Sequence, residues 1–482
     1  MLLTSYEYLI FILLLLCFYY LAPKKWQTGL LLCAGLLFYL RAGVFSLLFV
    51  LLSSGVTFFL TRSFTKKEKR AVFAVVACNV ALLVISRYVP FFAREGVRTM
   101  GTAYYVLMAV AYGIDVYRGK CTPEKNPFRL VLFLSFFPTA SMGPVARYDA
   151  LKETLFQPHS FRLREVQKGA LRILFGFFKK LVVADRLRIA VLALTGGAGY
   201  DGAFTLLLML FYTVQLYADF TGGIDIALGT AQMFGITLPE NFDLPYGAKT
   251  LASFWNRWHI TMGRWFTEYV FYPFSTSGCA AALMRLLKRC MSARNAGRVV
   301  VWISTLLVWA LTGLWHGAGA SFLVWGLMNG LILLVSRELT PLCRRAHARF
   351  PGWFSSPAWN AFCVFRTLFI VSSLRLFDCY RDVPRAFRSF ASIFTMRGLG
   401  DILSGNLSAL GPDAADYAVA AAGVLLMRAV SRLHAKGGAR RAVFAKPYMV
   451  RTLLGTLLLL AVLIFGVYGK GYDAAAFLYS GY

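Results

Sequence analysis

Long apolar runs follow one another along this chain and are separated by short basic or polar segments. A helix needs roughly 20 mostly apolar residues to cross a bilayer. The clearest runs of about that length cover residues 5–22, 43–61, 71–89, 299–315, 320–335 and 451–468. Their apolar residues are continuous rather than alternating, which is typical of membrane helices. The pattern predicts an all-α, polytopic transmembrane protein with on the order of a dozen spans, several of them short or interrupted.

The regularity of these runs changes along the chain and suggests three zones. Residues 1–99 hold N-terminal transmembrane helices. The first run lacks a basic leader and a small-residue cleavage site, so we expect it to stay as the first span. Residues 100–335 form an irregular core, in which apolar runs carry Pro, Gly, Trp, Arg and His, and residues 336–482 hold C-terminal transmembrane helices.

One irregular segment reads LVLFLSFFPTASMGPVARY, where Pro138, Gly143 and Pro144 interrupt an apolar run and Arg147 follows at once. Non-helical backbone at membrane depth is tolerated only where protein or a wet cavity surrounds it. The segment therefore predicts a broken or re-entrant helix of the kind that accompanies binding sites, with Arg147 as a candidate substrate-binding residue. A kinked packing helix is the alternative interpretation.

A second irregular segment, residues 249–274, predicts an amphipathic helix at the bilayer surface. Its large apolar residues recur at steps of three and four and would share one helical face: Trp255, Trp258, Met262, Trp265 and Phe266. Aromatic residues mixed with arginines are typical of a membrane interface. The segment is either an interfacial anchor or part of a site, in which case His259 and its neighbours Asn256, Arg257 and Trp258 are candidates.

A third segment, LTGLWHGAGASFLVWG, places His316 between two strongly apolar runs. Ionisable residues at membrane depth are costly and are functional candidates by default. The surrounding glycines, Gly313, Gly317 and Gly319, would let a neighbouring helix or a substrate approach the backbone closely. His316 and the adjacent Trp315 are therefore candidate site residues, although a lone histidine in a membrane helix can also be a structural hydrogen-bond donor.

Composition supports a membrane protein and argues against a nucleic-acid partner. The 482 residues are 58% hydrophobic with a mean hydropathy of +0.61 and only 15% charged residues. The net charge of +29 gathers in loops between the apolar runs, as at Lys24 and Lys25. Basic loops that alternate with weakly charged loops follow the positive-inside rule and predict a multi-pass cell-membrane protein in contact with anionic lipid, with its N-terminus outside.

Three carboxylates interrupt apolar runs and need partners. Asp219 and Asp225 lie in QLYADFTGGIDIALG and Asp115 lies in YGIDVYRG. Their partners are either arginines or a water-filled passage; we favour structural pairing over a functional role for each, and keep Asp219 as a candidate substrate-binding residue. The nine cysteines show no metal-ligand spacing and no disulfide framework, and those within apolar runs are interpreted as small buried hydrophobes.

In this order, the segments SFFPTASMGPVARY, ENFDLPYGAKTLASFWNRWHITMGRWFTEYVFYPF and LTGLWHGAGASFLVWGLMNG resemble the signature blocks of the membrane-bound O-acyltransferase superfamily. The bacterial branch with the alginate O-acetylase and the teichoic-acid D-alanyl transferase is the most similar. The resemblance covers residues 101–330 and departs from that branch at FSTSGCAA after Pro273 and at Thr267 and Glu268.

The resemblance implies a helical shell around a passage that joins a cytoplasmic acyl donor to an extracytoplasmic acceptor. It makes His316 the catalytic residue and His259 a second functional position. We expect acetyl transfer from acetyl-coenzyme A to a hydroxyl of an exported polysaccharide or cell-wall polymer, directly or through an extracytoplasmic partner acetyltransferase, without a metal. A neutral imidazole suits this chemistry because its ordinary pKa lies close to working pH.

Two other functions fit parts of the pattern. A D-alanyl transferase with a carrier-protein donor would share the family, and a transporter or flippase would share the spans and broken helices. Lys179, Lys180 and Arg186 are basic residues near a span end that could meet coenzyme A phosphates, and membrane topology explains them equally well.

Overall fold

The computed structural model describes residues 3–62, 69–93, 97, 99–197, 199–435 and 438–469. Every regular element in these residues is helical, apart from one isolated antiparallel bridge between Phe242 and Trp258. The predicted all-α class is confirmed. The chain divides into two compact units, which are described one at a time: Met1–Asp185, Leu216–Glu240 and Gly437–Tyr482 form the first, and Arg186–Gln215 and Asn241–Lys436 form the second.

The helices of the first unit lie at both ends of the chain. They are α1 Tyr6–Leu21, η1 Lys24–Trp26, α2 Gln27–Ala42, α3 Val44–Arg62, α4 Lys69–Tyr88, η2 Pro90–Ala93, α5 Thr102–Tyr117, α6 Pro127–Ser135, η3 Phe137–Thr139, α7 Tyr148–Leu155, α8 Leu163–Phe177, the π-helix η4 Phe178–Ala184, α22 Ala439–Phe444 and α23 Tyr448–Phe465. The long helix α10, Ala203–Met233, contributes its residues from Leu216 onward to this unit.

The second unit contains the start of α10, the helix α9 before it and the helices between Asn241 and Lys436. They are α9 Asp185–Gly196, η5 Pro245–Gly247, α11 Leu251–Trp255, α12 Ile260–Phe266, the π-helix η6 Thr267–Phe271, α13 Tyr272–Ser275, α14 Gly278–Leu287, α15 Ala293–His316, α16 Ala320–Arg349, α17 Pro351–Ser355, α18 Pro357–Tyr380, α19 Val383–Ser392, η7 Ile393–Thr395, α20 Leu399–Leu403, η8 Asn406–Leu410 and α21 Ala414–Ala435. The division into three zones along the sequence stays a prediction.

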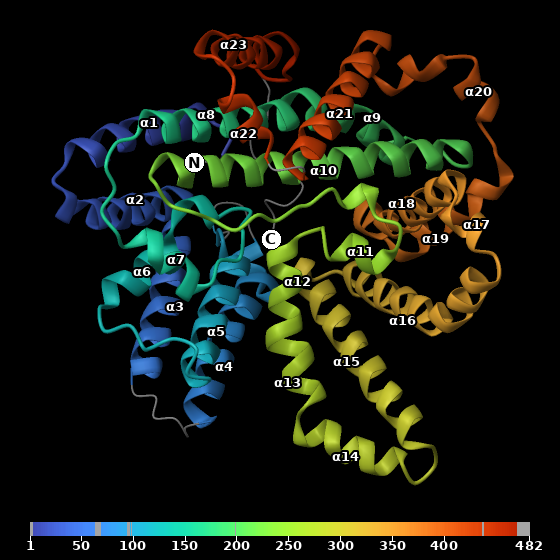
Figure 1. The fold of residues 1–482 in the computed structure, drawn as a ribbon, viewed down its shortest axis with the longest axis horizontal. Coiled ribbons are helices and arrows are strands. Elements are labelled where there is room, and N and C mark those ends of the chain that lie inside the picture. Colours follow the sequence, from blue (N-terminus) through green and yellow to red (C-terminus); the bar gives the residue numbers. More distant parts are fainter. Residues whose placement is uncertain are drawn as a thin grey trace. The chain divides into compact units, whose positions relative to one another are not determined.

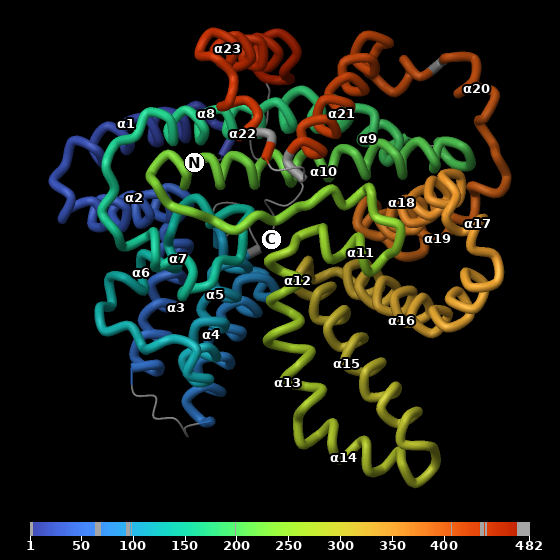
Figure 2. The backbone as a smooth tube through the Cα atoms, in the orientation of Figure 1, coloured from blue at the N-terminus to red at the C-terminus, as the bar shows by residue number. Residues whose placement is uncertain are grey.

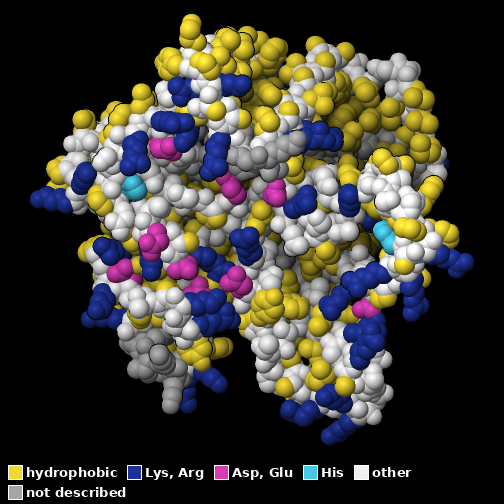
Figure 3. Space-filling view, in the orientation of Figure 1, with side chains coloured by type: hydrophobic (Ala, Val, Ile, Leu, Met, Phe, Trp, Pro, Cys, Tyr) yellow, Lys and Arg dark blue, Asp and Glu magenta, His cyan; other side chains and the backbone are white. Residues whose placement is uncertain are grey.

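Seven described helices are long and apolar enough to cross a membrane: α3, α4, α10, α15, α16, α21 and α23. This is fewer than the expected dozen, because several apolar runs form shorter helices; α1 and α5 have 16 residues each. The outer side chains of α23, such as Leu453, Leu457 and Ile464, are exposed, and apolar atoms dominate this helix in Figure 3. Apolar side chains that face away from protein are suited to lipid, as expected for a multi-pass membrane protein.

In the first unit, α3, α4 and α5 lie side by side (Figure 2). A buried polar cluster joins α3 to α4, where the Ser53 hydroxyl donates to Asn79 Oδ1 at 2.6 Å and Asn79 Nδ2 donates to Thr57 Oγ1 at 3.0 Å. Hydrogen bonds of this kind connect membrane helices where hydrophobic packing offers no preference over lipid. Of the cysteines, Cys17, Cys33 and Cys78 are exposed, so the expectation that they are buried is wrong for these helices.

The predicted interruption between α6 and α7 is confirmed. Helix α6 ends at Ser135, η3 adds one turn, and the backbone then stays non-helical until Tyr148. Met142 and Val145 are 1% and 2% exposed, so protein surrounds this irregular stretch, as membrane depth would require. Gly143 has φ +77, a left-handed conformation that favours glycine. A re-entrant course relative to the bilayer stays a prediction.

Helices α15 and α16 pack closely in the second unit (Figure 1). A Cβ atom on Gly313 would lie 2.3 Å from the Phe322 carbonyl oxygen, and one on Gly326 would lie 2.2 Å from the Trp309 carbonyl oxygen. The glycines therefore allow the two backbones to approach, as the sequence predicted for Gly313. This close crossing lies next to the C-terminal end of α15, where His316 is the last helical residue.

We expect Gly326→Ala to destabilise the protein by about 1–3 kcal/mol, because the added methyl group forces α15 and α16 apart. The measurement is the thermal unfolding midpoint of detergent-purified protein. Gly319→Ala is the matched control, since a Cβ there would lie 3.9 Å from its nearest neighbour. Equal midpoints for the two variants would contradict the close crossing.

Candidate functional site

The segment 249–274 is not the continuous amphipathic helix that its periodicity predicts. It forms α11, a short non-helical link, α12, the π-helix η6 and α13. The break lies at His259, whose φ of 49° and ψ of 52° place it in the left-handed region. This conformation is uncommon for a residue with a side chain and persists only where the surroundings determine it. Trp258, Met262 and Trp265 are nevertheless buried, as the periodicity implied.

Pairing with an upstream segment explains this break. The amide of Asp243 donates to the Arg257 carbonyl at 3.0 Å, and the amide of Ile260 donates to the Asn241 carbonyl at 3.0 Å. These two bonds flank the bridge between Phe242 and Trp258. Backbone groups that would continue a helix are satisfied instead by another segment, so the helix stops and the chain turns at His259.

The side chain of Asn241 fixes the tautomer of His259. Its Oδ1 accepts from the Thr261 amide at 3.0 Å and from the Thr261 hydroxyl at 2.9 Å, which identifies this atom as the oxygen. The same Oδ1 lies 3.3 Å from His259 Nδ1. A carbonyl oxygen can only accept, so Nδ1 carries the hydrogen and Nε2 of the neutral ring carries the lone pair.

His259 is neutral at ordinary pH. Its side chain is 0% exposed, and burial lowers the pKa of His259 from 6.5 to about 3. A hydrogen bond with the His259 backbone opposes this shift, and the positive charge of Arg375 adds to it. The ring is therefore held as an uncharged acceptor rather than as an imidazolium.

His316 lies at the end of α15 with 4% of its surface exposed. The Trp315 ring is centred 4.9 Å from it at an interplanar angle of 77°, and the Trp325 ring from α16 is centred 4.9 Å away at 81°. Two indoles thus meet the imidazole nearly at right angles and restrict the orientation of its plane.

Trp315 also joins the two histidines of the site. Its ring centroid is 5.9 Å from that of His259, and it is 4% exposed. The structure therefore brings together four of the predicted site residues, His316, His259, Trp315 and Trp258, within the second unit. The passage toward His316 and the functional roles of these residues stay predictions.

The other predicted residues of this segment differ in burial. Asn256 is exposed and Arg257 is half-buried, and both belong to the link between α11 and α12. Trp258 is 2% exposed and stacks on Phe254 with centroids 5.6 Å apart. Packing thus accounts for Trp258, and substrate binding by these three residues stays a prediction.

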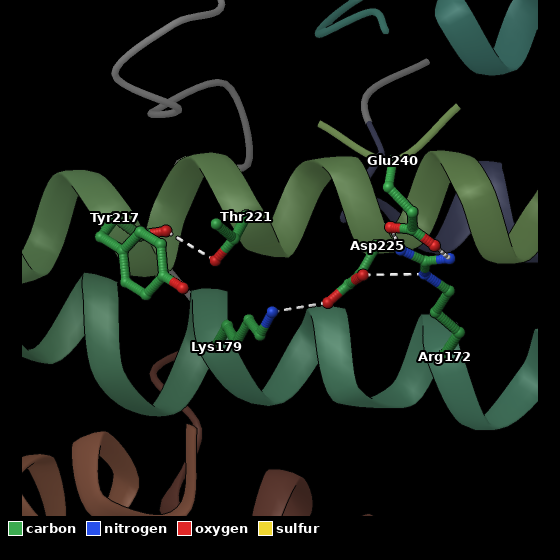
Figure 4. Close-up of polar contacts among 6 residues, drawn as sticks. All are labelled: Arg172, Lys179, Tyr217, Thr221, Asp225 and Glu240. Carbon is green, nitrogen blue, oxygen red and sulfur yellow. Dashed lines mark hydrogen bonds and ion pairs between the residues drawn. The ribbon is translucent and has the colours of Figure 1, made fainter. Parts of the chain in front are cut away.

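Asp225 belongs to an ionic network in the first unit (Figure 4). Its Oδ1 accepts from Arg172 Nε at 2.8 Å and its Oδ2 accepts from Lys179 Nζ at 2.6 Å. Arg172 also pairs with Glu240 at 2.6 Å. The network joins α8 and η4 to α10 and confirms the interpretation of Asp225 as a paired residue, since buried charges require partners.

Asp219 and Arg147 also have charged partners in the first unit. Lys180 Nζ lies 2.7 Å from Asp219 Oδ1 and 2.8 Å from Asp185 Oδ1, and Lys180 is 0% exposed. Arg147 Nη1 lies 3.6 Å from Asp115 Oδ2. These contacts confirm that Asp219 and Asp115 are paired, and substrate binding by Asp219 and Arg147 stays a prediction.

The three cations considered for coenzyme A phosphates all contact carboxylates. Lys179 pairs with Asp225, Lys180 with Asp219, and Arg186 with Asp416. The charge of each is compensated locally, so these contacts give no support to a phosphate site at these residues. No group of three or more possible metal-ligating side chains occurs among the residues that the structure describes.

Sequence reasoning missed Asn241 and Arg375. Asn241 lies 18 positions before His259, and nothing local marks it as a partner. Arg375 is 3% exposed in α18, and an ionisable residue within the apolar run RTLFIVSSLRLF was a signal that could have found it. Asn241 Nδ2 is buried without a hydrogen-bond partner among the described residues, which leaves one amide donor beside His259.

Comparison with known proteins identifies the family. The model of the membrane-bound O-acyltransferase family matches residues 125–287 and 288–377. The chain belongs to this family. Both histidines and their tryptophan neighbours lie inside the matched residues, so the site is part of the family's shared region.

Named relatives of this O-acyltransferase act on polymers. It is 31% identical to a probable alginate O-acetylase of Pseudomonas syringae over 56% of this chain and 49% of the relative. It is 28% identical to the peptidoglycan O-acetyltransferase of Helicobacter pylori over 57% and 56%, and 27% identical to the teichoic acid D-alanyltransferase of Bacillus subtilis over 54% and 66%. The chain thus spans about half to two thirds of these relatives.

The buried state of His259 makes the stability of this membrane-bound O-acyltransferase family member depend on pH. The folded pKa is about 3, against 6.5 for an exposed histidine, so protons bind preferentially to the unfolded chain as pH falls below 6.5. Between about pH 7 and pH 5 this linkage removes about 2 kcal/mol of stability. The thermal unfolding midpoint of His259→Gln should therefore fall less over this pH interval than that of the wild type.

The control is His347→Gln, which replaces an exposed histidine of α16. Its midpoint should follow that of the wild type as pH falls. A wild-type profile that is already as flat as that of His259→Gln would show that His259 is not held neutral by burial.

Proposed function

We propose that this O-acyltransferase moves an acetyl group from acetyl-coenzyme A to a hydroxyl of an exported polysaccharide or cell-wall polymer, with His316 as general base. The observation that carries the proposal is a buried histidine at the end of a membrane-spanning helix, fixed by two indoles and accompanied by a second, neutral histidine. Relatives named as alginate and peptidoglycan O-acetylating enzymes support the acetyl group and the polymer.

The reaction joins the acceptor oxygen to the thioester carbonyl carbon and breaks the carbon–sulfur bond. The hydroxyl proton passes to His316 as the new carbon–oxygen bond forms, and the departing thiolate takes up a proton afterwards. A positioned base contributes about 10²- to 10⁴-fold to such a step. Burial of His316 excludes bulk water, which would otherwise compete with the polymer hydroxyl for the acyl group.

His259 is suited to orient the acceptor. The hydrogen on Nδ1 is engaged by Asn241, so Nε2 presents a lone pair that can accept a hydrogen bond from the hydroxyl. Stabilisation of the oxyanion by His259 would need a hydrogen on Nε2 and is disfavoured by this tautomer. The amide Nδ2 of Asn241 is a buried donor in the same place, and we assign the developing oxyanion to it.

D-alanyl transfer is the second candidate, because two relatives are named teichoic acid D-alanyltransferases. The two donors differ in a way that an assay resolves, since one is a nucleotide thioester and the other is carried on a folded protein. An extracytoplasmic partner acetyltransferase that completes transfer to the polymer belongs to the proposal as a possible acceptor of the acyl group.

We expect His316→Ala to lower acetyl transfer by about 10²- to 10⁴-fold while its abundance in the membrane stays at the wild-type level. The assay uses purified protein, radiolabelled acetyl-coenzyme A, and either alginate or peptidoglycan fragments as acceptor. His347→Ala, in the exposed part of α16, is the control and should retain activity.

Normal acetylation by His316→Ala would refute His316 as the base. If the wild-type protein does not use acetyl-coenzyme A but transfers D-alanine from a charged carrier protein, D-alanyl transfer would be established instead.

A further inference from the structure

Arg375 of α18 is buried among three tryptophans of the second unit. It is 3% exposed, and its guanidinium carbon lies 5.0 Å from the ring centroid of Trp258, 5.3 Å from that of Trp325 and 5.9 Å from that of Trp255. These rings come from the α11 segment and from α16, so the cation is held by two elements besides its own helix. Each contact is within the range of a cation–π interaction, which is strongest where water is excluded.

One carboxylate also contacts Arg375. The carboxylate of Asp378 lies one turn further along α18, and its Oδ2 is 3.5 Å from Arg375 Nη1, which is a long contact. Asp378 also has a hydrogen bond with Tyr212, so its carboxylate is shared between Tyr212 and Arg375. A buried guanidinium is costly unless its surroundings compensate it, so the aromatic rings are an essential part of its environment.

Trp325 connects this cation to the catalytic candidate. The same indole that faces Arg375 at 5.3 Å meets the His316 ring at 4.9 Å, nearly at right angles. Trp255 supports it from the side, with ring centroids 5.8 Å apart. Replacing Arg375 would thus alter the packing of Trp325 and, through this shared indole, the orientation of the His316 ring.

We propose that Arg375 is a positioning residue for acyl transfer, which fixes Trp325 and through it the plane of the His316 ring. The proposal rests on the proposed function of His316. The imidazole needs a defined orientation because proton transfer requires its acceptor nitrogen to point at the reacting hydroxyl. Trp315 restricts the ring from its own helix, and Trp325, held by Arg375, restricts it from the neighbouring one.

Arg375→Gln should lower kcat for acetyl transfer by about 10- to 100-fold, because small displacements of a reacting group have effects of this size. KM for acetyl-coenzyme A should not change, since Arg375 does not contact the donor in this proposal. Arg375→Lys keeps the charge but loses the planar guanidinium, so it should restore part of the lost kcat. The control is Arg366→Gln on the same helix, where the guanidinium donates to the Lys249 carbonyl at 2.9 Å.

A double-mutant cycle tests the route through the shared indole. Trp325→Phe should lower kcat by itself, and adding Arg375→Gln should lower it little further, because both changes release the same contact. If Arg375→Gln fails to accumulate in the membrane, the cycle is run with Arg375→Lys.

Wild-type kcat in the Arg375 variant, or effects that multiply fully in the double variant, would overturn the positioning role. Failure of the proposed function is distinguishable, because then His316→Ala would also keep its activity.

Discussion

The hydrogen bond between Asn241 and His259 is the constraint on which the site depends. It joins two segments 18 positions apart and fixes which nitrogen of His259 carries the hydrogen, while backbone hydrogen bonds between the same two segments stop the helix that the sequence would otherwise continue. Burial then keeps the ring uncharged, so a polar side chain persists inside an apolar unit at limited cost. The Trp315 ring contacts both this fixed acceptor and the His316 ring.

Tryptophans and arginine complete the site by packing. Glycines bring α15 and α16 together, which lets Trp325 of one helix meet His316 of the other. Arg375 is then surrounded by indoles and contacts the carboxylate of Asp378. In the first unit, the buried Lys180 is instead paired with two acids, Asp219 and Asp185.

Features of the structure that depend on nearby residues could be predicted from the sequence. Apolar length predicted the spanning helices, Pro138 and Gly143 predicted the break after α6, and the isolated imidazole in an apolar run predicted His316 as a site candidate. The break at His259 could not be predicted from its own segment, because helical periodicity there is intact and the competing partner lies upstream. Exposed Cys17 and Cys33 show a related limit, since apolar periodicity does not distinguish lipid-facing from protein-facing positions.

The most direct test of the site is NMR of the purified protein carrying isotope-labelled histidine, with the His259→Gln spectrum subtracted. The ring nitrogens of His259 should show a hydrogen on Nδ1 and a bare Nε2, without change between about pH 7 and pH 5, because its pKa lies near 3. A His259 signal that titrates near the ordinary histidine value, or a hydrogen on Nε2, would contradict the fixed and neutral imidazole on which the site is built.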